Sequence, residues 1–145
     1  MNFRSQSRIG VRADAMVIWN LIADLPMWSR WNPIEKNVSG TFSFGGAFSA
    51  TESIPGLPER AFTGKVSSWT PGAQLVISEK RGFLFNSLRF FEIDELEPGS
   101  CIVANGQVFS GIRGEGFYEK HRRPLREAFD QVAESIKREA EARSS

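Results

Sequence analysis

The sequence predicts one α+β domain over residues 1–145, in which a strand and two short helices precede six antiparallel strands and a long C-terminal helix. Three observations predict this class. The 145 residues are 41% hydrophobic and 24% charged, as is typical of one soluble globular domain. Strand-like segments separated by Gly and Pro turns fill the middle of the chain. Apolar residues near the C-terminus recur at helical spacing instead.

The N-terminal segment is predicted to form a strand and then two short helices. Phe3–Val11 alternates weakly between apolar and polar residues, and Asp14 is a suitable N-cap for the helix that follows. Pro26 disfavours helical geometry in the residue before it and so ends this helix. A second short helix should then carry Trp28 and Trp31. The apolar residues of the first helix recur at helical spacing: Val17, Ile18, Leu21 and Ile22.

The middle of the chain is predicted to be a meander of antiparallel strands. Gly45-Gly46 can supply the positive φ angles of a tight hairpin turn. Pro-Gly pairs and single glycines punctuate the later strands. No interval is long enough for a crossover helix, so a parallel sheet is excluded. The expected strands are Ile34–Phe44, Ala47–Ile54, Arg60–Trp69, Ala73–Arg81, Asn86–Leu96 and Ser100–Ser110.

The C-terminal segment is predicted to be an amphipathic helix of roughly 20–30 residues that starts near Gly116. Pro124 lies inside it, and a proline removes a backbone donor and clashes with the preceding turn. We therefore expect either a kink near Pro124 or a helix that properly begins there. The apolar stripe comprises Tyr118, His121, Leu125, Ala128, Phe129, Val132, Ile136 and Ala140.

Composition and motifs exclude several classes of function. Eighteen Lys and Arg against seventeen Asp and Glu give a net charge of +1, which argues against nucleic acid as a partner. The chain has one histidine and one cysteine, without HExxH or paired CxxC, so no metal site is expected. The sequence lacks GxGxxG and P-loop motifs, and we expect no cofactor. Twelve Phe and four Trp instead favour a broad apolar interior or pocket.

The same sequence predicts a cytoplasmic protein. Cys101 has no second cysteine with which to form a disulfide, and Met1–Val11 lacks the apolar run of a signal peptide. No stretch approaches the ~20 consecutive apolar residues that span a bilayer, so no integral membrane segment is expected.

Several short strings, taken in order, resemble a known superfamily. They are Val17-Ile18-Trp19 with Leu21–Asp24, Trp28 with Trp31-Asn32-Pro33, Val38-Ser39-Gly40 with Gly45-Gly46, Gln107–Gly111, and Phe129–Glu139. Their order and spacing resemble the helix-grip fold of the START and birch-pollen-allergen (SRPBCC) superfamily, and within it the bacterial polyketide cyclase/dehydrase-like branch. The resemblance covers essentially the whole chain. It implies a curved sheet that wraps around the long helix, with an apolar cavity between them.

The resemblance leaves three functions open, because its members include carriers, cyclases and interaction modules. The leading interpretation is a carrier or sensor that binds a hydrophobic or amphipathic small molecule, such as a lipid, a polyketide or an aromatic compound, in the cavity. The first alternative is a cyclase or dehydratase that needs no metal or nucleotide cofactor. The second is a protein-interaction module, which predicts a filled core. A homodimer is also possible.

Candidate site residues follow from strand and helix parity. Asn105, Gln107 and Phe109 share one face of the last strand, but parity does not say which face is concave. The resemblance implies that this face lines the cavity, because Phe109 lies where the family's phenylalanine precedes the glycine that starts the helix; the alternative is an outward polar stripe. His121 and Tyr118, three residues apart, are the candidates for proton donation to a carbonyl, although a position of His121 on a solvated first turn is the stronger interpretation. The predicted ligand contacts are Trp28, Trp31, Ile77, Glu79, Phe83, Phe85, Phe91, Asn105, Gln107, Phe109, Tyr118, His121, Leu125 and Phe129.

Charged residues on the strands and an apolar turn complete the candidates. Glu79 and Arg81 would form a buried ion pair if their face is inward, but we expect them to mark the emergence of their strand into water. Glu52, Arg89 and Glu92 could simply lie on the convex face. Phe83-Leu84-Phe85 is unusual, because a hairpin tip should be polar. We expect it to form part of the cavity mouth, the alternatives being packing under Trp28 or Trp31 or burial in a homodimer.

Overall fold

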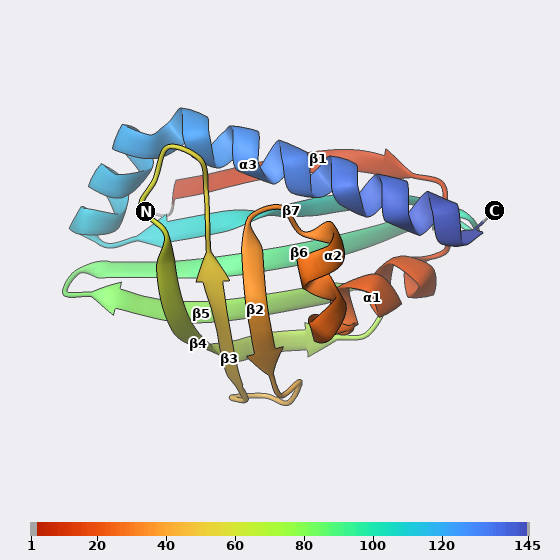
Figure 1. The fold of residues 1–145 in the computed structure, drawn as a ribbon, viewed down its shortest axis with the longest axis horizontal. Coiled ribbons are helices and arrows are strands. Elements are labelled where there is room, and N and C mark those ends of the chain that lie inside the picture. Colours follow the sequence, from red (N-terminus) through yellow and green to blue (C-terminus); the bar gives the residue numbers. More distant parts are fainter. Residues whose placement is uncertain (1–2, 145) are drawn as a thin grey trace.

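The computed structural model describes residues 3–144, while Met1, Asn2 and Ser145, the ends of the predicted 1–145 domain, lie outside the described residues. The predicted order of elements is confirmed (Figure 1). The elements are β1 (Phe3–Val11), α1 (Ala15–Ala23), the 3-10 turn η1 (Leu25–Met27), α2 (Trp28–Trp31), β2 (Glu35–Gly40), β3 (Ala47–Glu52), β4 (Arg60–Thr70), β5 (Gln74–Gly82), β6 (Phe85–Glu97), β7 (Ser100–Ser110) and α3 (Ile112–Ser144).

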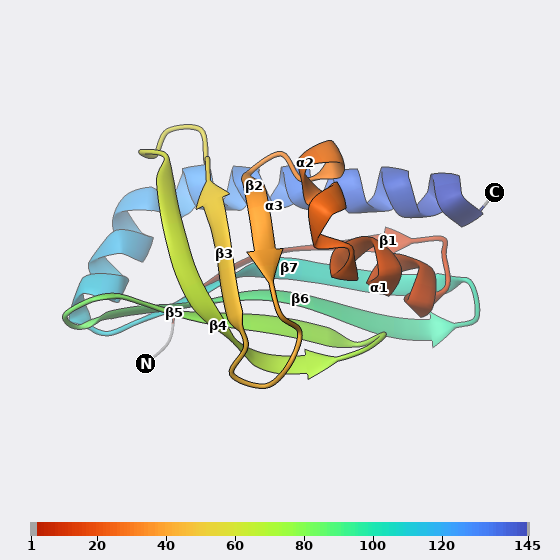
Figure 2. The same cartoon turned by 60° about the horizontal axis from the view of Figure 1, so that its bottom comes forward.

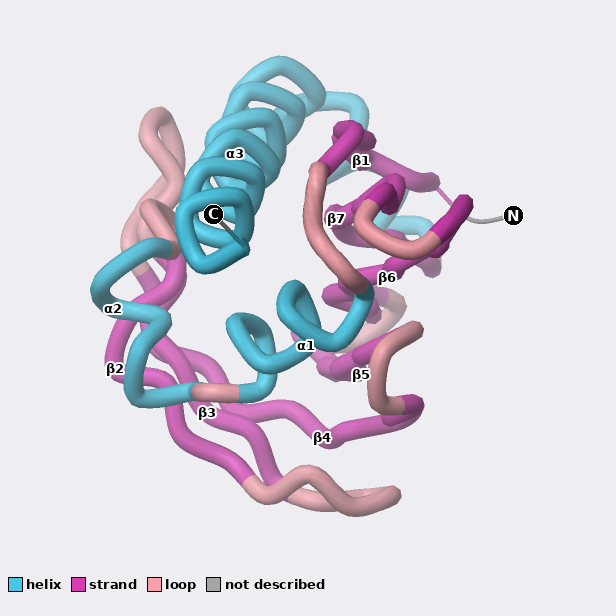
Figure 3. Tube along the Cα trace, turned by 90° about the vertical axis from the view of Figure 1, so that its right-hand side faces the viewer, coloured by secondary structure: helices cyan, strands magenta, loops and turns pink. Residues whose placement is uncertain are grey.

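The seven strands form one antiparallel sheet in the order β1-β7-β6-β5-β4-β3-β2. The first strand of the chain therefore pairs with the last, and Phe3 lies opposite Phe109. Seen from one end, the sheet curves around α3, with α1 inside the curve and α2 beside the β2 edge (Figure 3). The predicted α+β architecture, a curved sheet wrapped around a long C-terminal helix, is thus confirmed.

Helix α3 is kinked, as the position of Pro124 predicts. His121 has non-helical angles (φ −118°, ψ 21°), three residues before Pro124. Proline has no N–H to donate to the carbonyl of residue 120, and its ring crowds the preceding turn, so the break falls there. The loop between β3 and β4 packs at this point, since a Cβ on Gly56 would lie 3.6 Å from the Pro124 ring. The helix spans 33 residues, more than the sequence predicts, because it already begins at Ile112.

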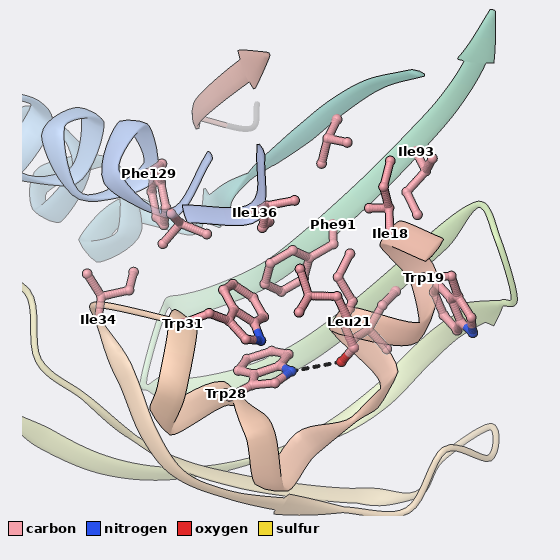
Figure 4. Packing of buried hydrophobic residues seen from close by; sticks show 14 of the residues in the cluster. Ile18, Trp19, Leu21, Trp28, Trp31, Ile34, Phe91, Ile93, Phe129 and Ile136 are labelled. Carbon is pink, nitrogen blue, oxygen red and sulfur yellow. Dashed lines mark hydrogen bonds between the residues drawn. The ribbon is translucent and has the colours of Figure 1, made fainter. Parts of the chain in front are cut away.

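The C-terminal part of α3 covers a packed core (Figure 4). Phe129 and Ile136 are fully buried against the sheet and the short helices. Trp28 packs edge-on against Phe91, with ring centroids 5.3 Å apart, and donates its indole N–H to the carbonyl of Ile22 at 2.8 Å. Buried tryptophans usually have such a partner for their N–H; the N–H of the neighbouring Trp31 has none among the described residues. This half of the molecule is therefore filled by its own side chains.

The prediction of a tight hairpin turn at Gly45-Gly46 is wrong. Strand β2 ends at Gly40, and residues 41–46 form a longer loop. Gly45 does take a positive φ of 79°. The loop is held by β4, because the N–H of Gly45 donates to the Val66 carbonyl and the N–H of Val66 donates to the Gly46 carbonyl, both at 2.8 Å. Backbone pairing with a third strand thus determines the loop, rather than a two-residue turn.

No helix among residues 3–144 has the length and apolar character that crossing a bilayer requires.

Candidate functional site

A pocket of about 360 Å³ lies at the end of the molecule where α3 begins. Its size falls within the ~300–1,000 Å³ usual for small-molecule sites. Figure 1 shows the first turns of α3 at an angle to the rest of the helix, so the two parts of α3 cover different regions of the sheet. The pocket is lined by Glu52, Leu57, Pro58, Arg60, Arg81, Phe85, Phe117 and His121. It therefore combines an apolar wall with charged groups.

The charged wall is an ion network of two carboxylates and two guanidinium groups. Arg60 binds Glu79 through both terminal nitrogens, at 2.6 and 2.9 Å, and reaches Glu52 at 3.2 Å through Nε. Arg81 lies 3.8 Å from Glu52 and 3.7 Å from Glu79. Gln107 adds a hydrogen bond from its Nε2 to Glu52 at 3.1 Å. The four charges balance, as a group buried from water requires.

The expectation that Glu79 and Arg81 mark the emergence of β5 into water is wrong. Their side chains are only 10% and 6% exposed. They continue the parity of Leu75 and Ile77, which face the core, and the inward partner Arg60 compensates their burial. The buried ion pair that their parity allows is therefore the arrangement found.

The guanidinium of Arg81 is the least satisfied group of the network. Its Nε donates to Ser87 Oγ at 2.9 Å, but its Nη2 has no hydrogen-bond partner among the described residues. Three aromatic rings surround the group, with centroids at 5.3 Å (Phe85), 5.4 Å (Phe109) and 5.1 Å (Phe117). Burial lowers the pKa of Arg81, the carboxylate of Glu52 opposes this, and the charge of Arg60 adds to the lowering. The group remains a cation, since arginine is not deprotonated in proteins.

His121 borders the same pocket at the kink of α3. Its ring packs against Phe117, with centroids 4.7 Å apart, and Phe117 in turn contacts the Arg81 guanidinium. Loss of hydration lowers the pKa of His121 below its usual value, and the charge of Lys120 lowers it further. The lowered pKa favours the neutral form of the imidazole, which can accept a proton.

We expect the single histidine to titrate below its usual pKa of 6.5 when followed by NMR of its ring protons. Lys120→Gln should raise the pKa of His121, because one of the charges that oppose protonation is removed. Since the folded-state pKa is lowered, the folded protein loses stability as the pH falls from about 6.5 through the folded value. Lys137→Gln, on the far part of α3, should leave the titration unchanged. A pKa at or above 6.5 would contradict this assignment.

The structure does not place Tyr118 beside His121 in the pocket. Tyr118 packs on Phe3 and Phe109, with centroids 5.6 and 6.4 Å away. It lines a separate surface groove together with Arg4 of β1 and three arginines of α3, Arg122, Arg123 and Arg126. Of the two candidate proton donors, His121 lines this pocket and Tyr118 does not.

The polar residues of β7 that we expect to line the cavity point inward, but neither they nor Phe109 line the pocket. Asn105, Gln107 and Phe109 are all buried. Asn105 donates from Nδ2 to the carbonyl of Phe129 at 3.1 Å and so ties the sheet to α3. The side-chain oxygens of Asn105 and Gln107 have no hydrogen-bond partner among the described residues.

The remaining predicted contacts divide between the pocket end of the molecule and the packed core. Phe85 lines the pocket, as predicted for the cavity mouth, whereas Phe83 is exposed at the turn beside it. The packed core, rather than the pocket wall, holds Trp28, Trp31, Ile77, Phe91, Leu125 and Phe129.

Sequence reasoning missed Glu52 and Arg60 as pocket residues. Glu52 follows Phe48 and Ala50 at the same parity, and both of these are buried, so the alternation already pointed inward. Arg60 has the parity of the buried Val66 on β4. The signal was present, but a charged side chain at a strand end is normally interpreted as solvated. The pocket residues Leu57, Pro58 and Phe117 carried no comparable signal.

A second buried ion pair lies away from the pocket. Arg89 contacts Glu35 through Nε and Nη2 at 3.0–3.2 Å, and Asn32 donates to the same carboxylate at 3.0 Å. A convex position for Arg89 is therefore excluded. Glu92, by contrast, lies on the opposite face and pairs with Arg4 at 2.8 Å. No cluster of three or more His, Cys, Asp or Glu within residues 3–144 could hold a metal ion.

No protein-family model matches this sequence, and no curated protein matches it. Solved structures do match in shape. An aromatase/cyclase, Zhui, from a Streptomyces species superposes with a TM-score of 0.76 at 12% identity, covering 99% of this chain and 96% of that one. Norcoclaurine synthase from Thalictrum flavum, in complex with dopamine and hydroxybenzaldehyde, gives 0.71 at 12% identity, covering 100% and 90%. The chain has the helix-grip fold.

The helix-grip resemblance inferred from sequence is therefore confirmed at the level of fold. A third structure, the di-domain aromatase/cyclase StfQ from the steffimycin biosynthetic pathway, matches with a TM-score of 0.74 at 14% identity. That superposition covers 99% of this chain and 52% of StfQ.

Proposed function

We propose that this helix-grip protein binds a small amphipathic molecule, with an aromatic or aliphatic body and an oxygen acceptor, in the pocket beside the kink of α3. The observation that carries the proposal is Arg81, a buried cation in a box of three aromatic rings whose Nη2 lies 3.8 Å from Glu52 and has no hydrogen-bond partner among the described residues. A buried donor without a partner costs free energy. A ligand oxygen on this guanidinium would supply the missing acceptor.

The two walls of the pocket have different roles in this proposal. Phe85 and Phe117, whose rings are 5.2 Å apart, would cover the body of the ligand. Burial of about 200 Å² of apolar surface contributes about 5 kcal/mol before the costs of association. The bond to Arg81 would add orientation, since hydrogen bonds to charged groups are stronger than neutral ones. Glu79 is hydrogen-bonded to Arg60 and lies 3.7 Å from Arg81, so it competes only weakly with a ligand oxygen for the Arg81 guanidinium.

A carrier or sensor needs no more than this binding. The fold neighbours support the proposal, because one of them holds dopamine and hydroxybenzaldehyde. The cytoplasm is the proposed location, since the lone Cys101 is buried as a free thiol.

A pair of fluorescent probes tests the proposal. The anionic 1-anilinonaphthalene-8-sulfonate and the neutral N-phenyl-1-naphthylamine share one aromatic body and differ in the sulfonate. We expect both to bind the wild type. Arg81→Met should weaken the anionic probe by about 10- to 100-fold, the range for a charge-assisted bond, and the neutral probe by less than about 3-fold.

Arg113→Met is the matched control, because Arg113 is exposed and does not line the pocket. It should leave both affinities unchanged. Failure of the wild type to bind either probe, or an equal loss of both probes in Arg81→Met with the fold intact by circular dichroism, would contradict the proposed role of Arg81.

A second candidate function is a cyclase- or dehydratase-type enzyme. The observation that favours it is the stack of Arg81, Phe117 and His121 on one wall of the pocket. Neutral His121 could take a proton from the carbon beside a carbonyl, while the electron pair moves to the carbonyl oxygen held by Arg81. Turnover of a polyketide-like ketone would distinguish the enzyme from a carrier, which releases its ligand unchanged.

A further inference from the structure

Three apolar side chains are exposed at the end of the molecule that holds the pocket. Phe83 and Leu84 form the turn between β5 and β6 and are 77% and 43% exposed, and Ile112, the first residue of α3, is 74% exposed. Figure 2 shows this turn projecting beside the start of α3. We call Phe83, Leu84 and Ile112 the apolar tip.

The apolar tip is held in place rather than loose. The backbone N–H of Arg113 donates to the Leu84 carbonyl at 3.1 Å, and the Arg113 side chain donates to the Phe83 carbonyl at 3.4 Å. Leu84 has a φ of 56°, a left-handed conformation that favours glycine or asparagine. A large apolar residue thus occupies a turn position where glycine would cost less and expose no hydrophobic surface.

The apolar tip is continuous with the pocket wall and has cations beside it. Phe85, which lines the pocket, directly follows Leu84. Lys80 precedes the turn on β5, opposite Asn86, and Arg113 follows Ile112. Glu115 is the acidic residue of the first turn of α3. Projecting apolar groups flanked by Lys and Arg suit the surface of an anionic bilayer.

The size of the apolar tip argues against a second copy of the chain as its partner. Three partly exposed side chains, at roughly 150–250 Å² for a whole aromatic residue, offer less than the ~800 Å² that each partner of a standard interface buries. Insertion into the headgroup region requires no such area, because the lipid surrounds each side chain.

We propose that the apolar tip inserts into the interface of an anionic membrane, with Lys80 and Arg113 near the lipid phosphates. The mouth of the pocket then lies at the lipid surface, where an amphipathic ligand can enter or leave without crossing water. This exchange rests on the proposed pocket function, whereas the membrane contact itself does not.

Co-sedimentation of the full chain with vesicles tests the contact. We expect binding to vesicles of equal parts phosphatidylcholine and phosphatidylglycerol, and weaker binding to phosphatidylcholine alone. Phe83→Ser combined with Ile112→Ser should lower the bound fraction at least about fivefold. Arg113→Gln should weaken vesicle binding by about fivefold, because one Lys or Arg near an anionic membrane surface contributes about that factor to affinity. Added salt should reduce the difference in binding between the wild type and Arg113→Gln.

Phe44→Ser is the matched control, because Phe44 is 88% exposed on the loop between β2 and β3 and is equally apolar. It should leave vesicle binding unchanged. An equal loss in Phe44→Ser, no binding to the anionic vesicles, or a wild-type dimer by light scattering that Phe83→Ser dissociates would each overturn the proposal.

The two proposals fail separately. Vesicle binding that persists while neither fluorescent probe binds would leave the membrane contact standing and remove the pocket function. Probe binding without any vesicle binding would leave the pocket function standing and remove the membrane contact.

Discussion

Arg89→Met is expected to lower the free energy of unfolding by about 3–5 kcal/mol, the usual cost of removing one partner of a buried ion pair. The side chains of Arg89 and Glu35 are 4% and 1% exposed. Without the guanidinium, the Glu35 carboxylate would keep only Asn32 as a side-chain donor among residues 3–144. Urea unfolding followed by tryptophan fluorescence measures the loss, since Trp28 and Trp31 lie in the same core.

The control for this prediction restores charge balance. Glu35→Leu combined with Arg89→Met should recover most of the stability, because a buried ion pair is often no better than an apolar pair of similar volume. Arg126→Met, at the exposed pair with Asp130 on α3, should change the free energy of unfolding by less than about 1 kcal/mol. A single variant as stable as the wild type would show that water reaches Glu35.

The Arg89–Glu35 pair joins parts of the sheet that are not neighbours. Glu35 begins β2, at one edge, whereas Arg89 lies on β6, four places away in the strand order. The Arg89 guanidinium also faces the rings of Phe91 and Phe129, at 4.2 and 5.0 Å from their centroids. Curvature of the sheet brings these groups together inside it. The pair thereby links β2, the middle of the sheet and α3.

The pocket network repeats this arrangement. Gln107 on β7 reaches Glu52 on β3, again across the inside of the curved sheet. Such contacts explain what the sequence could not predict. Period-two alternation identified the strands, and β1 and β7 have the predicted bounds, because alternation is a local property. The partner of a buried charge on a distant strand is not local.

The location of the pocket could be predicted only in part. Pro124 predicts the kink of α3. The apolar hairpin turn Phe83-Leu84-Phe85 predicts that Phe85 lies at the cavity mouth. The extent of the hollow depends on which aromatic side chains fill it, and that follows from packing rather than from spacing. Trp28 and Phe129, predicted as ligand contacts, instead occupy the core beneath the straight part of α3.

The filled and hollow parts of α3 should respond differently to the same truncation. Phe129→Ala is expected to lower the free energy of unfolding by about 3–5 kcal/mol, because it leaves a cavity among fully buried neighbours. Phe117→Ala should cost only about 1–2 kcal/mol, since Phe117 is partly exposed and borders a space that already exists. Thermal and urea unfolding of both variants measure the difference.

Binding should show the reverse order. Phe117→Ala is expected to weaken N-phenyl-1-naphthylamine by about tenfold, because removal of a ring that covers the ligand loses about 1–2 kcal/mol of contact. Phe129→Ala should leave the affinity of its folded fraction within about threefold, since Phe129 contacts Arg89 and the core rather than the pocket. If Phe129→Ala instead abolished probe binding while Phe117→Ala did not, the ligand would have to lie beneath the straight part of α3, where side chains now fill the space.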